Sequence, residues 1–471
     1  MNHRLDKMKD DEWWDNFPAA LRPAYAFGEV NEPISLYKGE LEIEKNQRIT
    51  QGNGEVYLKW FPYPQIEFKL SSNRSLIGDD TGEAKLKLTG IQGLVKVRIS
   101  ELNRNVKFNE ILNQVDDSIQ VRGRPIEPII IGSGNDLAYI KFHLTNFHEL
   151  FGSCSSVFVS EDFSKTVIQR VVFEAGVWRV TIDQLERTTV SKILKSLKFQ
   201  GGYGVTHVGK LERNDQTVFA ANEARDFLEA FSYFLSFVRG FRVSPTLLVG
   251  YNVTEEEVWK EWTSSNSDSW KSVDSWAWGV PGTSLKNAFP GFWQWWQDWG
   301  KSAKLAIYWY LHSNRNAGGT EGSIVLAQAA LELLSWVELV EKGSITEKDF
   351  NKGGGFNSTS RKINQLLKEC GIPQDIPSEF IELAEFESQL HHSNHNGAYA
   401  FVELRNSITH SAPENRHRFT NTSAEAIEEA WILGLWYVEM VILKLCDYNE
   451  SYFNRIQKEG YSGDLKYVPW K

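Results

Sequence analysis

The chain has 471 residues, of which 41% are hydrophobic and 24% charged, so it is ordinary globular material with room for two or three domains. Its net charge of −10 argues against a protein that coats nucleic acid over its whole surface, and an RNA site would have to confine its positive potential to a cleft. Three widely separated cysteines, Cys154, Cys370 and Cys446, argue against a disulfide framework and favour a reducing cytoplasm.

The apolar stretches of the chain do not predict a membrane protein. The first twelve residues lack the apolar core of a signal peptide. The longest apolar stretches, residues 324–340 and 431–446, are short for a bilayer span, and each contains two charged residues. We therefore expect two buried helices in a cytoplasmic protein that does not enter a membrane.

The first part of the chain, residues 1–218, is predicted to be a β-rich domain with a sensing or regulatory role. Residues 84–88 and 95–99 alternate strictly between apolar and polar, as half-buried strands do. Clusters of Gly, Asn and Asp separate the strand-like runs. The expected strands are residues 56–61, 66–70, 84–88, 94–99, 138–144, 156–159, 167–173 and 177–182. We expect an antiparallel sandwich or barrel with its own core.

Near the end of this region, Gly204, Gly209 and Lys210 nearly match the phosphate-cradling loop G-x4-G-K-[ST]. Leu211 occupies the place of the hydroxyl that binds magnesium. No apolar strand leads directly into the segment, and no obvious helix follows it. The structural context of a phosphate-binding loop therefore fails, and we interpret these glycines as a turn inside the β domain.

The chain changes character near residue 219. Residues 221–240 have apolar side chains at helical spacing, residues 244–251 suggest a strand, and residues 255–282 look like an irregular Trp-rich segment. We therefore expect residues 219–290 to be a helix followed by a connecting region.

Helical patterns dominate residues 291–471. The expected helices are residues 292–314, 321–342, 360–370, 378–389, 398–407 and 423–448. Their short connections predict an antiparallel all-α bundle. With the β-rich first part, the fold class is α+β.

An aromatic patch lies at the start of the first of these helices. Trp293, Trp296 and Trp299 are spaced at i, i+3 and i+6, so they share much of one helical face. Few basic residues interleave with them, which disfavours a surface that stacks RNA bases. We expect them to pack in the core or in a dimer interface.

The residues best suited to chemistry are Arg405, Asn406 and His410. Arginine offers a permanent cation, histidine can exchange a proton, and asparagine can orient either one. On one continuous helix Arg405 and His410 would point about 140° apart, so they converge only if the helix ends between them. Pro413 and the weak helix formers before it predict that end, with a new helix near Ser423. The same spacing also arises by chance, with the Arg tying down a helix terminus and the His lying on the surface.

Other charged and imidazole groups lie near this segment in the sequence. Lys362, Arg416, His417 and Arg418 could add positive potential around Arg405, although most such residues are merely solvated.

A histidine cluster precedes the segment. His391, His392 and His395 could hold a divalent metal if a fourth ligand came from elsewhere. A polar loop between two helices explains the cluster as well, and so does a supporting role beside Arg405 and His410. The chain contains no G-x-S-x-G elbow and no CxxC pair, which leaves a serine hydrolase or a cysteine-based zinc or redox site without support.

Leu404, Arg405, Asn406, Ile408 and His410 resemble the motif of the HEPN family, whose four- or five-helix proteins carry R-N-x-x-x-H between their last two main helices. Residues 204–213 and the helices that follow are similar to prokaryotic HEPN proteins with a large β-rich N-terminal domain. Some of these, the ApeA-like proteins, are linked to anti-phage defence.

The resemblance implies a HEPN-like bundle that acts as a metal-independent endoribonuclease, without a cofactor, in anti-phage defence or toxin-like growth arrest. His410 would transfer protons, Arg405 would stabilise charge on the phosphorus, and Asn406 would position one of them. Because one motif supplies one His, the resemblance also implies a homodimer in which two motifs share a cleft. RNA would be the substrate, and an unknown trigger ligand or phage component would bind the β-rich domain.

Two alternatives stay open. The bundle could be a non-catalytic HEPN-like module for dimerisation or RNA binding, with a β domain that senses a ligand. The chain could instead be a ligand-binding β protein on a helical scaffold, in which Trp-rich segments bind a carbohydrate or another flat ligand.

Overall fold

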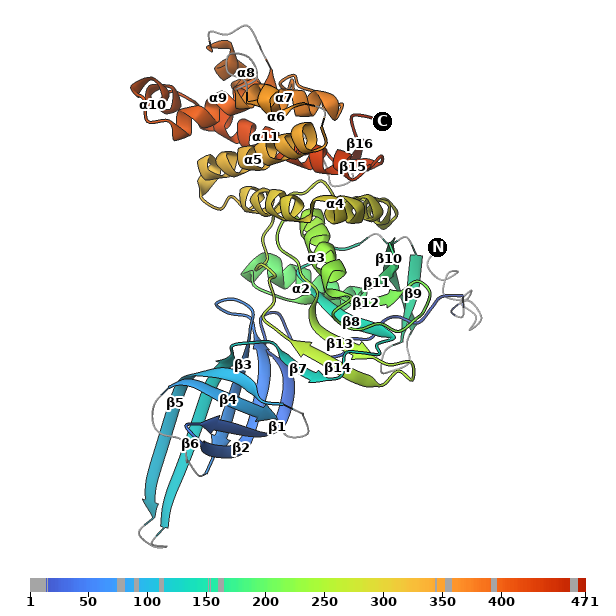
Figure 1. Cartoon of the computed structure of the whole chain (residues 1–471), viewed down its shortest axis with the longest axis vertical. Coiled ribbons are helices and arrows are strands. Elements are labelled where there is room, and N and C mark those ends of the chain that lie inside the picture. The colour runs from blue at the N-terminus through green and yellow to red at the C-terminus, as the bar shows by residue number, and fades with distance from the viewer. Residues whose placement is uncertain are drawn as a thin grey trace, which may run out of the picture.

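The computed structural model describes residues 14, 16–73, 81–88, 93–109, 114–150, 152, 154–159, 165–343, 345–351, 358–390, 396–457 and 465–471. Figure 1 shows three tiers: a β-barrel at one end, a large sheet in the middle and a group of helices at the other end. The prediction of an α+β chain with a β-rich first part and a helical last part is confirmed.

The first tier is a closed antiparallel barrel with strand order β1-β2-β3-β6-β5-β4. Apolar side chains alternate with polar ones in strands such as β1, β3 and β4, and the inward-facing Leu41, Val56, Phe68 and Leu86 are fully buried. The strands are β1 Ile34–Lys45, β2 Arg48–Lys59, β3 Gln65–Ser72, β4 Gly82–Leu88, β5 Val95–Asn109 and β6 Gln114–Pro125.

The second tier is an eight-stranded antiparallel sheet of order β7-β14-β13-β8-β12-β11-β10-β9. Its strands are β7 Ile129–Gly132, β8 Tyr139–Thr145, β9 Cys154–Val159, β10 Lys165–Ala175, β11 Trp178–Gln184, β12 Val205–Arg213, β13 Thr246–Tyr251 and β14 Glu257–Trp262. Strands from both sides of residue 218 therefore share this sheet. Helix α2, Arg187–Gln200, lies between β11 and β12 in the chain and was not predicted.

The interpretation of Gly204 to Leu211 as a turn is wrong. These residues enter β12, which pairs with β8 on one side and β11 on the other. Gly209 is needed there because a Cβ atom would meet the ring of Phe142 at 2.1 Å. The expectation of an irregular segment over residues 255–282 is also wrong in part, since β14 lies within it.

Two long helices connect the sheet to the third tier. Helix α3, Arg225–Arg239, packs on the sheet, and α4, Gly282–Asn314, lies across it (Figure 1). The backbone of α4 leaves helical geometry at Trp299, with φ −134° and ψ 25°. Trp295 and Trp296 are buried, and the Trp293 ring lies 5.1 Å from that of Phe227. The aromatic patch therefore packs in the core of the chain.

The third tier contains α5 Gly319–Trp336, which continues into the π-helical turn Val337–Glu341, then α6 Glu347–Phe350, α7 Thr359–Glu369, α8 Ile381–Ser388, α9 Gly397–Thr409, α10 Pro413–Thr420 and α11 Ala424–Leu445. A short hairpin, β15 Ser451–Phe453 with β16 Leu465–Tyr467, follows. Helix α11 packs against α4, α5, α8 and α9.

One stretch, Gly319–Glu341, is long and apolar enough to cross a membrane. However, 56% of its most apolar window is buried inside the protein, against α4 and α11. Its composition is therefore explained by its place in the core of the helical tier.

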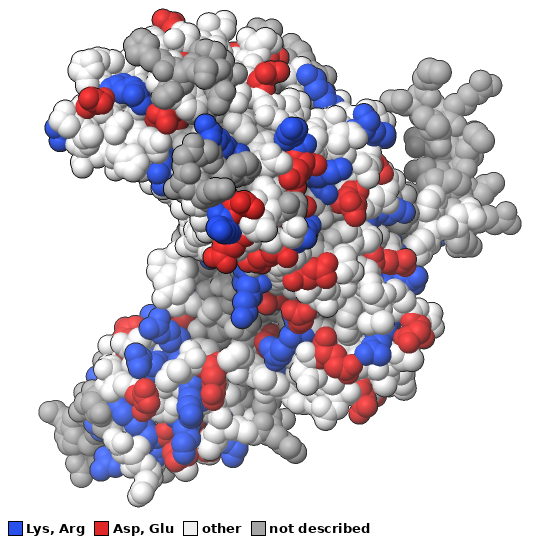
Figure 2. Space-filling model, turned by 45° about the horizontal axis from the view of Figure 1, so that its top comes forward, with Lys and Arg blue, Asp and Glu red and all other residues white. Residues whose placement is uncertain are grey.

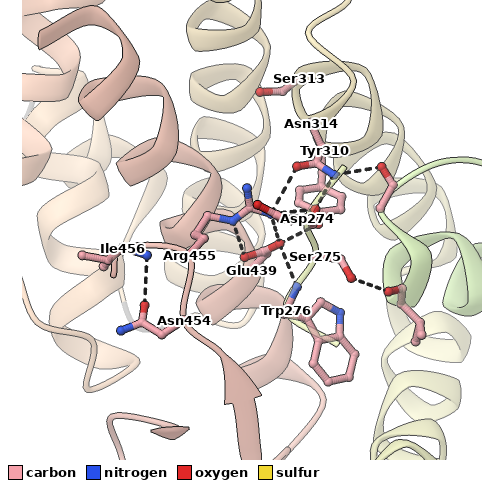
Figure 3. Close-up of polar contacts among 12 residues, drawn as sticks. Asp274, Ser275, Trp276, Tyr310, Ser313, Asn314, Glu439, Asn454, Arg455 and Ile456 are labelled. Atoms are coloured by element: carbon pink, nitrogen blue, oxygen red, sulfur yellow. Dashed lines mark hydrogen bonds and ion pairs between the residues drawn. The ribbon is translucent and has the colours of Figure 1, made fainter. Parts of the chain in front are cut away.

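A buried ion pair between Glu439 and Arg455 forms hydrogen bonds that link the helical tier to the rest of the chain. Glu439 of α11 accepts hydrogen bonds from Nε of Arg455 at 2.8 Å, from the hydroxyl of Tyr310 at 2.6 Å and from the backbone N–H of Trp276 at 3.2 Å (Figure 3). Arg455 also donates to Asn314 at 3.1 Å. Burial alone would lower the pKa of Arg455, but the Glu439 carboxylate raises it overall.

Candidate active site

Arg405, Asn406 and His410 lie at the C-terminal end of α9. The side chain of Asn396 caps the helix start by accepting from the backbone N–H of Tyr399. The helix runs to Thr409, two residues beyond the expected end, and His410 is its extended C-cap residue, with φ −93° and ψ 127°. Its backbone N–H donates to the Asn406 carbonyl at 2.9 Å. The predicted helix end between Arg405 and His410 is confirmed.

The segment after His410 differs from the prediction. Pro413 stands in the first turn of a short helix, α10, where its missing N–H costs no hydrogen bond. The next helix, α11, begins as predicted, because the side chain of Ser423 caps it by accepting from the N–H of Ala426 at 3.1 Å.

The guanidinium of Arg405 makes few hydrogen bonds. Its Nη1 donates one long bond of 3.4 Å to the side-chain oxygen of Asn406. Its Nε is buried and has no hydrogen-bond partner. Within the described part of the chain no carboxylate forms an ion pair with Arg405. A half-buried guanidinium in this state is suited to receive an anion.

The nearest carboxylate is held by other groups. Glu403 accepts from Nη1 of Arg418 at 3.1 Å and from the side-chain amide of Asn406 at 3.3 Å. Asn406 thus donates to Glu403 and accepts from Arg405, and this orients its amide. Glu403 was not predicted from the sequence, although its position three residues before Asn406 on a helix places the two side chains side by side.

His410 is exposed. Among the described residues no hydrogen bond to its imidazole is present, so the ring can reach a solvent-borne substrate. The backbone bond from His410 to Asn406 keeps the residue within one helical turn of the Arg405–Asn406 pair.

The other predicted cations are spread out. The Nζ of Lys362 on α7 lies 4.2 Å from the centre of the Phe350 ring, so this cation is engaged with an aromatic ring. Arg416 and His417 are exposed on α10, and the His417 ring is bonded to Asn421. Arg418 joins the motif through Glu403.

A hollow of about 740 Å³ lies between α8, α10 and the start of α11. His417 and Arg418 line it, and so do Glu382, Glu385 and Glu414, which gives it an excess of negative charge. Its lining does not include Arg405, Asn406 or His410. The pair between Arg418 and Glu403 therefore stands between the hollow and the motif.

The metal-site alternative concerns His391, His392 and His395, which lie outside the residues that the structure describes. In the described ranges no group of three or more His, Cys, Asp and Glu side chains is placed to hold a metal ion. The phosphate-loop alternative fails on geometry, because the backbone of β12 is bonded to two neighbouring strands and Lys210 pairs with Glu212 at 2.6 Å.

Two domain models match this chain. The YopA central domain matches residues 132–273, which contain strands β8 to β14 of the large sheet with α2 and α3. The YopA C-terminal domain matches residues 296–465, from within α4 to β16. The SPbeta prophage-derived uncharacterized protein YopA of Bacillus subtilis (strain 168) is 26% identical over 462 residues, which cover 96% of this chain and 98% of that protein. No solved structure matches. The matched models are YopA domains, so the resemblance to HEPN proteins rests on the motif and its helices.

Proposed function

We propose that the helical tier is a HEPN-like bundle and a metal-independent endoribonuclease that cleaves RNA at the Arg405–His410 end of α9. The observation that carries the proposal is the state of Arg405. Its guanidinium is half-buried, oriented by Asn406 and unpaired with any carboxylate in the described part of the chain, while His410, whose side chain is exposed, caps the end of the same helix.

The chemistry would use the RNA's own 2′-hydroxyl. A base removes its proton, the oxygen attacks the adjacent phosphorus, and an acid protonates the leaving 5′-oxygen. The products are a 2′,3′-cyclic phosphate and a 5′-hydroxyl. His410 would carry one of the two protons. Arg405 would stabilise the added negative charge at phosphorus, and Asn406 would hold the guanidinium in place.

The charge around the motif sets the mode of binding. On the face drawn in Figure 2, Lys and Arg are interspersed with Asp and Glu, and the molecule is hollowed between the helical tier and the barrel. Because the carboxylates Glu382, Glu385 and Glu414 line the neighbouring hollow, RNA would approach the motif locally, through one or two phosphates. Cleavage should therefore depend only weakly on salt.

A second proton carrier is needed, and a second copy of the chain would supply it in a shared cleft. Trp296 and most apolar residues of α11 are buried within one chain, and Trp293 and Trp299 are partly buried against the same core, so little of either surface is left for this dimer. The exposed surface of α10 and the end of α9 would have to provide the contact.

The test is cleavage of a fluorescent RNA oligonucleotide in excess EDTA, with product ends identified by mass spectrometry. His410→Ala should lower the rate about 100- to 10,000-fold and Arg405→Ala about 100- to 1,000-fold, with unchanged thermal melting. Arg416→Ala is the matched control, because Arg416 is exposed on the adjacent helix. A 2′-deoxy substitution at the cut site should block the reaction.

If two chains share one cleft, two different inactive variants should complement each other. A mixture of the inactive Arg405→Ala and His410→Ala proteins should regain part of the activity through mixed dimers. Cleavage by a monomer at a rate independent of protein concentration would contradict the shared cleft, and full activity of His410→Ala would remove His410 from the mechanism. Loss of activity in His417→Ala would move the proton transfer to α10.

The excess of carboxylates near the motif favours one alternative, a non-catalytic helical module. Such a protein would show no cleavage with any of these substrates, and His410→Ala would match the parent in every assay.

A further inference from the structure

A second hollow lies where the sheet tier meets α4. Its volume is about 600 Å³, within the range of small-molecule sites. One wall comes from α3 and the segment before β13, and the other comes from the second half of α4. It is lined by Arg225, Asp226, Leu228, Glu229, Ser232, Tyr233, Ser236, Arg242, Ser244, Pro245, Leu248, Asn266, Tyr308 and Leu311.

Arg242 brings an uncompensated positive charge to this hollow. Its backbone N–H donates to the Asp268 carboxylate at 3.0 Å, but that carboxylate pairs with the side chain of Arg315 at 2.6 Å. The Arg242 guanidinium contacts Nε2 of His312 at 3.4 Å and lies 5.3 Å from the centre of the Tyr308 ring. No carboxylate in the described ranges pairs with that guanidinium.

His312 acts as a neutral support for Arg242. Burial lowers the pKa of His312, and Arg242 and Arg315 lower it further. A neutral imidazole can accept from the guanidinium through Nε2 without adding a second charge. The arginine is thereby held in place while its remaining donors stay available.

Two of the other charged groups of the hollow form ion pairs, Glu229 with Lys304 at 2.6 Å and Arg225 with Glu261 at 2.9 Å. Asp226 accepts from two neutral donors, the Trp296 indole at 3.4 Å and the Gln297 amide at 3.2 Å. These donors lie about three turns of α4 before Tyr308 and His312, which Arg242 contacts. At the Tyr308 end of the hollow, Arg242 is therefore the unpaired charge among the lining residues, and it is suited to bind an anion.

The remaining lining residues fit a ligand that has a flat, partly apolar ring system beside its anionic group. Tyr308 is 39% exposed and Tyr233 is half-buried, and both line the hollow together with Leu228, Pro245 and Leu248. The Tyr308 ring also lies 4.4 Å, centre to centre, from that of His312, so a planar ligand would contact the part of the Tyr308 ring that is left exposed. Exposed aromatic surface binds planar rings by stacking. The Ser232 hydroxyl donates to the Val243 carbonyl at 3.0 Å and the Ser244 hydroxyl to the Pro245 carbonyl at 3.3 Å, so both hydroxyl oxygens can accept from a ligand N–H. A bare phosphate would leave most of the volume empty.

We propose that this hollow, here called the Arg242 pocket, binds a nucleoside phosphate, with the phosphate on Arg242 and the base beside Tyr308. The ligand would touch α3 and α4 together, and α4 leads directly into the helical tier. Binding would therefore tighten the junction between the tiers. The proposal does not depend on RNA cleavage.

The test is calorimetric titration of the full chain with adenosine, guanosine, cytidine and uridine 5′-monophosphates, and with adenosine and inorganic phosphate alone. At least one monophosphate should bind and raise the melting temperature, and it should bind more tightly than either of its parts. Arg242→Gln should weaken binding at least about tenfold, because it removes a charge-assisted hydrogen bond. Tyr308→Leu should weaken it as well.

The controls separate the pocket from the rest of the chain. Lys301→Ala changes an exposed cation on α4 outside the pocket and should bind as the parent does. His410→Ala should also bind normally. The Arg242 side chain makes no ion pair in the described structure, so Arg242→Gln should melt within a few degrees of the parent. Absence of binding at millimolar concentration, equal binding of phosphate alone, or undiminished binding by Arg242→Gln would each overturn the proposal.

Discussion

Replacing Glu439 by Gln should destabilise the helical tier more than any surface change of the same size. The side chains of Glu439 and Arg455 are 0% and 7% exposed, and they meet at 2.5 Å. Gln keeps the shape and can still accept from Tyr310, but it leaves the Arg455 cation buried without an opposite charge. Breaking such a pair on one side costs about 3–5 kcal/mol.

The assay is urea unfolding followed by far-ultraviolet circular dichroism. The change in the free energy of unfolding is taken from the transition whose midpoint the substitution shifts. Glu174→Gln is the matched control, because Glu174 pairs with Arg179 at a similar 2.7 Å while the two side chains are 52% and 39% exposed. The control should cost about 0–1 kcal/mol, since water screens an exposed pair.

A second substitution should recover much of the loss. Replacing both partners, Glu439→Gln with Arg455→Met, removes the uncompensated charge and keeps an acceptor for the Tyr310 hydroxyl and the Trp276 N–H, so it should restore much of the stability. A loss below about 1 kcal/mol in Glu439→Gln, or a double variant as unstable as the single one, would show that the pair does not hold the tiers together in the way argued.

Two further predictions concern the eight-stranded sheet. Burial lowers the pKa of His143 from 6.5 to about 4 and that of His207 to about 3. At a pH between the lowered pKa of each histidine and 6.5, the unfolded chain therefore binds more protons than the folded one. Stability should therefore fall as the pH drops from 7 to 5, by about 2 kcal/mol for each histidine, and His143→Gln should reduce the fall in urea midpoint between these pH values. Gly209→Ala should cost about 1–3 kcal/mol in urea unfolding, because its Cβ meets Phe142, while nucleotide affinity stays unchanged; the reverse result would revive a phosphate-binding loop.

Local chemistry in the sequence was enough to predict some strands but not the whole barrel. The strict alternation in β4 and at the start of β5 was read correctly. The segment of β1 and β2 contains Gly39, Gly52 and Gly54, which look like loop signals. In the barrel, a Cβ on Gly54 would meet Leu41 at 2.3 Å, so this glycine allows close packing inside a strand.

The sheet order could not be predicted because it depends on distant pairings. β8 pairs with β12 and with β13, strands that lie more than 60 residues further along the chain. Only tertiary packing decides between such partners, whereas the sequence windows record local periodicity. Helix α2 was missed because only Val190 and Leu197 of its residues are buried, which leaves a weak apolar stripe.

The motif shows the same division. The start of α11 near Ser423 and the departure of His410 from the helix follow from local chemistry, and both were predicted. Helix α10 was missed because Pro413 was taken only as the end of a helix, although proline is also favoured at a helix start. The Arg242 pocket had no signal in the sequence, since its walls come from segments that are about 65 residues apart.

Arg418 should affect catalysis without touching RNA, if the proposed function holds. It pairs with Glu403 at 3.1 Å, and Glu403 is separated from Arg405 by the single amide of Asn406. Without Arg418, the Glu403 carboxylate would lose its ion-pair partner and would attract the nearby Arg405 guanidinium. Arg405 would then bind the RNA phosphate more weakly. Arg418→Ala should therefore raise KM and lower the cleavage rate about tenfold, an effect of about 1.4 kcal/mol, within the range for a charged hydrogen bond. The added substitution Glu403→Gln should restore activity, because it removes the competing charge. If the double variant stays as slow as Arg418→Ala, Arg418 acts on the substrate itself and not through Glu403.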